Sequence, residues 1–177
     1  MLSRNGHIST VAQLSFDDYR SMASNPAELV VAGVERCLEY AGTWHAWDGR
    51  PIAGTVEDAG DLRPNVWTPA KALRRINDHL VDHLHEVAAL LAGAAPMPDQ
   101  WHGRFVTLGA DWARLTEPDF DEARSRLRRL ARSYVLMYEI AGPEAWDAPR
   151  DPAWTLREIA EHVAHVDAYA EEVGRLM

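Results

Sequence analysis

WTPAKALRRINDHLVDHLHEVAALL, residues 67–91, and WTLREIAEHVAHVDAYAEEV, residues 154–173, are the two stretches that decide the fold of this chain. Each opens on Trp-Thr and continues with apolar residues spaced three and four apart, which is the period of an amphipathic helix. In the first, Thr68-Pro69 is typical of an N-cap followed by the first helical residue. The predicted apolar face of the first stretch comprises Leu73, Ile76, Leu80, Leu84, Val87 and Leu91. That of the second comprises Leu156, Ile159, Val163, Val166, Ala170 and Val173.

Two further segments carry the same period. One is predicted to begin at Asn25-Pro26, with the asparagine as cap, and to run to about Tyr40 before Gly42. The other is predicted over residues 119–141, before Gly142-Pro143. The inward residues of the first are Leu29, Val30, Val34, Cys37 and Leu38. Those of the second are Phe120, Ala123, Leu127, Leu130, Tyr134, Met137 and, at its end, Ile140.

Four amphipathic helices without convincing alternating strands predict an all-α four-helix bundle with long connections. We expect one domain over residues 25–177, preceded by an N-terminal arm over 1–24. The connections over 42–66 and 93–118 are rich in tryptophan and histidine: Trp44, His45, Trp47, Trp101, His102 and Trp112. The aromatic residues of the first connection either fold over a pocket mouth or, as we favour, pack the connection onto the bundle.

The amino-acid composition argues against several classes of protein. The chain has 177 residues and a net charge of −9, and this acidic balance argues against binding to nucleic acid, whose phosphates would be repelled. A single cysteine excludes an internal disulfide and fits a reducing cytosol. Residues 1–20 lack the apolar core of a signal peptide, and no stretch approaches the roughly 18 apolar residues that span a bilayer. We therefore expect a cytoplasmic protein that acts on a small molecule, with no membrane partner.

Histidines beside the apolar stripes form the candidate site. His79 and His83 are four residues apart, so they lie one turn apart on one flank of their helix, whereas His85 points to the other flank. His162 borders the stripe of the last helix on the same flank as Tyr169. Three imidazoles leave an open position on a metal ion, and imidazole suits zinc, nickel, iron or copper. We predict His79, His83 and His162 as metal ligands.

Plainer interpretations stand beside this one. Two histidines spaced by four are more often half-exposed side chains than ligands, and His162 alone is more often a hydrogen-bonded boundary residue. Asp167 and Glu161 are candidate partners of the ligands, or else surface charges. Cys37 lies in an apolar rhythm and is better explained as a buried structural cysteine than as a nucleophile.

The two quoted stretches resemble the DinB-like (DinB/YfiT) superfamily of four-helix bundles over residues 65–177. The resemblance implies a divalent metal, here zinc or nickel, held by three histidines, and frequent homodimers. It also implies, for some relatives, a transferase or isomerase that uses a low-molecular-weight thiol such as bacillithiol, mycothiol or glutathione. Similar proteins carry late histidines four apart. Here Val166 stands four after His162, and the side chain of His165 is turned by about 100° from that position.

Two functions follow from these observations. The first is a metal-dependent thiol transferase or isomerase acting on a small electrophile, with the metal lowering the pKa of the thiol and Tyr169 orienting the substrate. The second is a binding or stress-associated bundle that keeps the fold without metal or catalysis. The pair His79 and His83 favours the first, and Val166 in place of a histidine favours the second.

Overall fold

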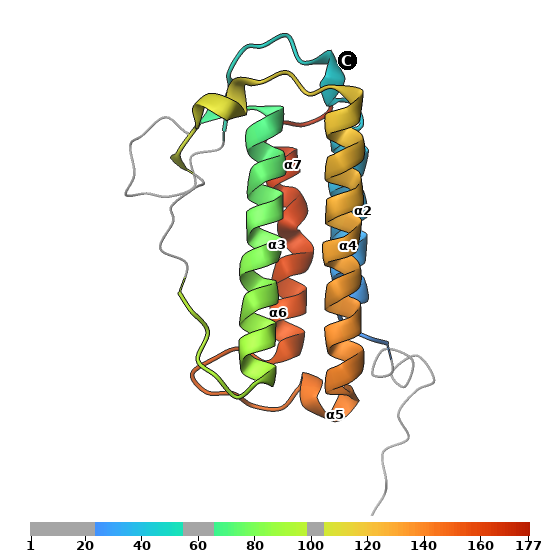
Figure 1. Cartoon of the computed structure of the whole chain (residues 1–177), viewed down its shortest axis with the longest axis vertical. Coiled ribbons are helices and arrows are strands. Elements are labelled where there is room, and N and C mark those ends of the chain that lie inside the picture. The colour runs from blue at the N-terminus through green and yellow to red at the C-terminus, as the bar shows by residue number, and fades with distance from the viewer. Residues whose placement is uncertain (1–23, 55–65, 99–104) are drawn as a thin grey trace, which may run out of the picture.

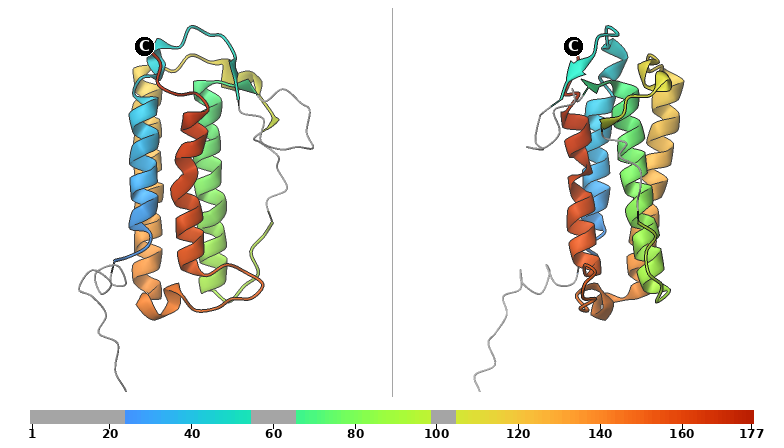
Figure 2. Two further views of the ribbon diagram at one scale, coloured as in Figure 1. Left: turned by 180° about the vertical axis from the view of Figure 1, so that it is seen from behind. Right: turned by 90° about the vertical axis from the view of Figure 1, so that its left-hand side faces the viewer.

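The computed structural model describes residues 24–54, 66–98 and 105–177, which form a mainly helical, all-α fold. Its long helical segments lie side by side with roughly parallel axes (Figures 1 and 2). They are α2 (Glu28–Ala41), α3 (Pro69–Leu91), α4 (Glu117–Ala141) and a last segment made of α6 (Leu156–Val163), η4 (Ala164–Asp167) and α7 (Ala168–Glu171). Both α2 and α3 contact α4 and also the last segment, so the four segments enclose a common core.

Short elements join these segments: η1 (Trp44–Ala46), β1 (Ile52–Ala53), β2 (Val66–Trp67), η3 (Gly109–Trp112) and α5 (Pro143–Trp146). The two strands pair antiparallel, with Ile52 opposite Trp67. The sequence did not predict this pair, because two residues are too few to show alternation. The pair ties the middle of the first connection to the residues that lead into α3.

Threonine caps set three of the helix starts. Thr68 accepts a hydrogen bond from the backbone N–H of Lys71 (3.2 Å), and Thr155 accepts one from Glu158 (3.2 Å). The predicted start at Thr68-Pro69 is confirmed. The predicted start at residue 119 is two residues late, because the cap is Thr116 and Asp119 completes its capping box. The start predicted at Asn25 is early, since α2 begins at Glu28 and Asn25 caps only the preceding turn.

The predicted core faces are largely confirmed. Every predicted inward residue of the last segment is buried, and on α3 the fully buried ones are Ile76, Leu80 and Val87. The prediction that Leu29 and Ile140 face the core is wrong, because both side chains are exposed. On α4 the buried face includes Tyr138 as well as Tyr134. Their hydroxyls donate to the carbonyls of Leu156 (2.5 Å) and Leu80 (2.7 Å), so both buried O–H groups are satisfied and tie α4 to its neighbours.

The last segment is not the continuous helix that its apolar period predicts. It changes at η4, where His165 has φ −86° and ψ 15°. At this point α2 lies closest, because Gly33 has no side chain to separate it from the carbonyl group of Ala164. That carbonyl accepts a hydrogen bond from Nη2 of Arg36 (3.0 Å), and Arg36 also forms an ion pair with Asp167. One side chain of α2, that of Arg36, thus satisfies a backbone carbonyl group of the irregular turn.

Replacing Gly33 by alanine tests this close approach. A Cβ at residue 33 would overlap the carbonyl oxygen of Ala164, and this overpacking outweighs the gain in helix propensity. We expect Gly33→Ala to lower the free energy of unfolding by roughly 1–3 kcal/mol in chemical denaturation. Gly109→Ala is the control, since a Cβ there meets no atom within 4 Å. Equal stability of the two variants would contradict the packing described.

The aromatic residues of the first connection pack onto the helices, as the favoured interpretation predicts. Trp44 and Trp47 are buried, and their indole N–H groups donate to the carbonyls of Gly174 (2.8 Å) and Arg50 (2.8 Å). His45 is exposed. Trp101, His102 and nearly all of the predicted arm over 1–24 lie outside the described residues. None of the helices described is long and apolar enough to cross a membrane.

Candidate metal centre

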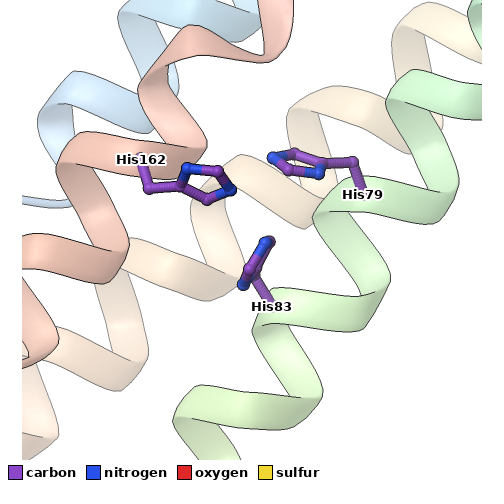
Figure 3. A group of neighbouring side chains, drawn as sticks. All are labelled: His79, His83 and His162. Atoms are coloured by element: carbon purple, nitrogen blue, oxygen red, sulfur yellow. The ribbon is translucent and has the colours of Figure 1, made fainter. Parts of the chain in front are cut away.

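Three imidazoles from two helical segments converge between α3 and α6 (Figure 3). His79 and His83 come from α3 and His162 from α6, and one ligand nitrogen from each lies within 4.8 Å of the others. The ring centres are 4.6 Å apart for His79 and His83, 4.8 Å for His83 and His162, and 5.1 Å for His79 and His162. The ring planes are tilted or edge to face, with interplanar angles of 75°, 73° and 55° for the same three pairs. The three residues that the sequence predicts as ligands are therefore brought together.

Local helix geometry explains this convergence. The spacing of four stacks His79 above His83 on the flank of α3 that α6 and α7 contact. His162 lies at the end of α6, one turn before η4 turns the chain. His165 is exposed on that turn, and Val166 is fully buried in the core, so neither joins the cluster. His85 lies elsewhere on α3, where its Nε2 accepts a hydrogen bond from the backbone of Met97 (3.2 Å).

A carboxylate orients one of the rings. Glu86 lies 2.7 Å from Nδ1 of His83, which leaves Nε2 of His83 available to a ligand. A carboxylate on the far nitrogen fixes the tautomer of a metal-binding histidine and raises its basicity. The sequence interpretation missed Glu86, although its spacing of three from His83 was the signal. It named Glu161 and Asp167 instead; Glu161 is exposed and Asp167 pairs with Arg36.

Desolvation disfavours a proton on two of the three imidazoles. Desolvation first, and then the neighbouring His83 and His162, lower the pKa of His79 to about 3. Desolvation and then His83 also lower the pKa of His162. Imidazole binds a metal only in its neutral form, so the lowered pKa values of His79 and His162 favour cation binding. The same environment disfavours a proton on His79.

Two aromatic rings border the histidines. Tyr169 of α7 has its ring centre 5.6 Å from that of His79, and it lies 5.9 Å from the ring of Trp67. Trp154 lies 5.0 Å from the ring of His162 and is 46% exposed. The tryptophans of the two Trp-Thr openings thus differ in exposure: Trp67 is fully buried, whereas the Trp154 ring is partly exposed beside the histidines. The role of Tyr169 in orienting a substrate stays a prediction.

Buried basic residues on α3 were not predicted. Lys71 is fully buried; its Nζ donates to the carbonyl of Val66 (2.5 Å) and lies 4.7 Å from the centre of the Trp67 ring. Desolvation, followed by the charge of Arg74, lowers the pKa of Lys71 to about 8. Lys71, Arg75, His79 and His83 follow one another at intervals of four along the helix. That spacing was visible in the sequence, but polar residues beside an apolar stripe are usually interpreted as exposed to solvent.

Cys37 is a structural residue, as the favoured interpretation predicts. The side chain is fully buried in α2, and desolvation raises the pKa of the thiol to about 12. A thiol with such a pKa is almost wholly protonated at neutral pH and is a poor nucleophile. Any thiol chemistry at the histidines must therefore use an external thiol.

A hollow of about 570 Å³ lies elsewhere, between α3, η3 and α4. Two of its arginines are paired with carboxylates that also line it: Arg74 with Asp111 (2.7 Å), and Arg126 with Glu122. No histidine or cysteine is among the residues that line it. The histidine cluster is the better candidate for chemistry. It gathers three nitrogens that can bind a metal ion, whereas the hollow contains ion pairs between its own side chains.

The donor set fits a divalent transition metal. Zinc binds imidazole nitrogen at roughly 2.0–2.1 Å, so ligand nitrogens of a tetrahedral site lie about 3.4 Å apart. The separations within 4.8 Å seen here need only small rotations of the rings. A lowered pKa at His79 and His162, a carboxylate on His83 and a set of only three imidazole ligands are the features of a centre that binds a further ligand.

Comparisons with known proteins do not assign this chain to a family. No protein-family model matches the chain, and searches of curated proteins and of solved structures give no match either. The resemblance to DinB-like proteins, and every function it implies, therefore stays a prediction.

The low pKa of His79 predicts a pH dependence of the metal-free protein. Below the ordinary histidine pKa of 6.5, His79 binds a proton in the unfolded chain. In the folded protein it binds one only near pH 3, because its pKa is lowered to about 3. This contribution to stability is complete above pH 6.5 and is lost as the pH falls from there. We expect the free energy of unfolding, measured with a chelator present, to fall on acidification by up to about 1.4 kcal/mol per pH unit more than in His79→Gln. Parallel pH profiles of the two proteins would contradict it.

Proposed function

We propose that this chain is a DinB-like four-helix bundle that holds a divalent metal, zinc or nickel, on His79, His83 and His162. We further propose that it transfers a low-molecular-weight thiol to a small electrophile, or isomerises one with the help of such a thiol. The observation that carries the proposal is the convergence of three imidazole nitrogens within 4.8 Å from two helical segments. A cytoplasmic homodimer that binds no nucleic acid belongs to the same proposal.

The residues have separate tasks in this proposal. A divalent ion supplies one thing, a positive charge that lowers the pKa of a thiol so that the thiolate forms near neutral pH. Burial keeps His79 unprotonated, and Glu86 holds the ring of His83 in the tautomer that presents Nε2. Trp154 offers an exposed ring face beside His162, against which the electrophile packs. Tyr169 orients the substrate from the opposite side, beside His79.

The alternative is a bundle that has the fold but neither metal nor catalysis. The burial of Val166 at the place where similar proteins carry a histidine favours it, because that residue serves the core. The exposure of His162 favours it too. The two proposals differ in whether the protein holds metal, so metal analysis separates them.

Metal content is the decisive measurement. We expect protein purified without an affinity tag to contain close to one divalent ion per chain and His83→Ala to contain almost none. His85→Ala is the matched control, because it removes a histidine of the same helix that lies outside the cluster. Metal-free wild-type protein whose melting temperature is unchanged by added zinc or nickel would favour the alternative, since a specific ligand stabilises the folded state.

Glu86→Gln tests the orientation of His83. Glutamine keeps the size of the side chain but loses the charge that makes the ring more basic, so we expect zinc affinity to fall roughly 10- to 100-fold. Competition with a chromophoric chelator measures the dissociation constant. Glu161→Gln is the control, because Glu161 is exposed on α6 next to His162 and should change that constant little. Equal affinities of the two variants would remove Glu86 from the site.

A further inference from the structure

Arg75 is a buried cation one helical turn before His79. Its side chain is only 7% exposed, although it belongs to a residue type that is almost never buried without a partner. The spacing of four from His79 places it on the flank of α3 that carries the cluster. Its guanidinium carbon lies 5.6 Å from the ring centre of Tyr169, whose ring contacts His79. Arg75 is therefore a neighbour of the proposed metal centre.

The hydrogen-bonding capacity of Arg75 is incompletely used. Nη1 pairs with the carboxylate of Asp78 at 3.3 Å, a long contact to a half-buried partner. Nε is buried and has no hydrogen-bond partner among the residues that the structure describes. A buried donor without a partner costs free energy, and a charged one costs more. A ligand that accepted a hydrogen bond from Nε would remove this cost.

The charge balance also calls for an anion. Three neutral imidazoles bring no negative charge to a divalent ion, and Arg75 adds a further positive charge beside it. The two carboxylates that pair with these groups, Asp78 with Arg75 and Glu86 with His83, offset two of the three positive charges. A ligand with a carboxylate would reduce this excess and accept hydrogen bonds from the planar arginine fork, which matches carboxylate geometry.

We propose that Arg75 binds a carboxylate of the small molecule that occupies the histidine site, so that the substrate class is a carboxylic acid. This inference rests on the proposed function, since the carboxylate is placed relative to a bound metal. Tyr169 lies between Arg75 and His79 and packs against the chain that connects the carboxylate to the reacting end. Arg75 determines specificity in this arrangement, and it takes no part in the chemical step.

Cobalt-loaded protein and a matched pair of small probes test the proposal. Cobalt(II) on three histidines has a visible spectrum that responds to a fourth ligand, so propionate and the neutral propionamide can be titrated without knowing the reaction. We expect Arg75→Gln to weaken propionate binding at least about tenfold, which is about 1.4 kcal/mol, and to leave propionamide unchanged. Asp78→Asn removes the competing carboxylate and should tighten propionate binding several-fold.

Arg157→Gln is the control for loss of one positive charge. Arg157 lies on α6, five residues before His162, but its guanidinium is occupied by Asp147 at 2.7 and 3.0 Å. We expect it to change the propionate affinity less than twofold. If Arg75→Gln does not fold, which its lost cobalt spectrum would reveal, Asp78→Asn decides, because misfolding does not tighten binding.

The outcomes separate the two proposals. A normal cobalt spectrum with equal propionate affinity in wild type and Arg75→Gln would overturn the carboxylate assignment and leave the metal centre standing. An unchanged affinity in Asp78→Asn would overturn the assignment as well. Wild-type protein that takes up no cobalt would overturn the metal centre, and the carboxylate assignment with it.

Discussion

The close approach of α2 to the last helical segment is the constraint on which the candidate site depends. Gly33 lets the carbonyl group of Ala164 lie against the backbone of α2, and Arg36 satisfies both that carbonyl and Asp167. The segment is thereby fixed at the turn that follows α6. The last segment has α2 on one side and α3 on the other (Figure 2). His162 lies just before the turn, so the contact with α2 determines where its imidazole meets α3.

Desolvation does two things at the histidine cluster. It lowers the pKa of His79 and His162, which favours neutral rings with one unprotonated nitrogen each, and it strengthens each electrostatic interaction made there. The half-buried rings of His79 and His83 and the exposed ring of His162 bring their ligand nitrogens together, an arrangement that a cation would stabilise. The single carboxylate on His83 supports that ring alone. The arrangement is thus more readily explained by a bound metal than by the stability of the fold.

Charge is distributed unevenly over this acidic chain. On α4 the arginines form pairs with neighbouring acids, among them Arg128 with Glu35 at 2.7 Å, and such exposed pairs contribute little. The buried cations Lys71 and Arg75 lie on α3, in line with the histidines. The negative surface and the basic row are compatible, because Lys71 and Arg75 are buried. The burial of these cations fits the proposed small anionic ligand.

The sequence by itself determined the helices, their caps at Thr68 and Thr155, and most of the apolar faces, because these follow from local periodicity and from hydrogen bonds within four residues. It also selected His79, His83 and His162, since helical spacing fixes which flank a side chain takes. Tertiary structure alone decided the turn at η4, the exposure of Ile140 and the burial of Arg75, because each depends on a neighbouring segment distant in sequence. Glu86 lies between these cases: its spacing from His83 was visible, but only packing excluded the competing carboxylates.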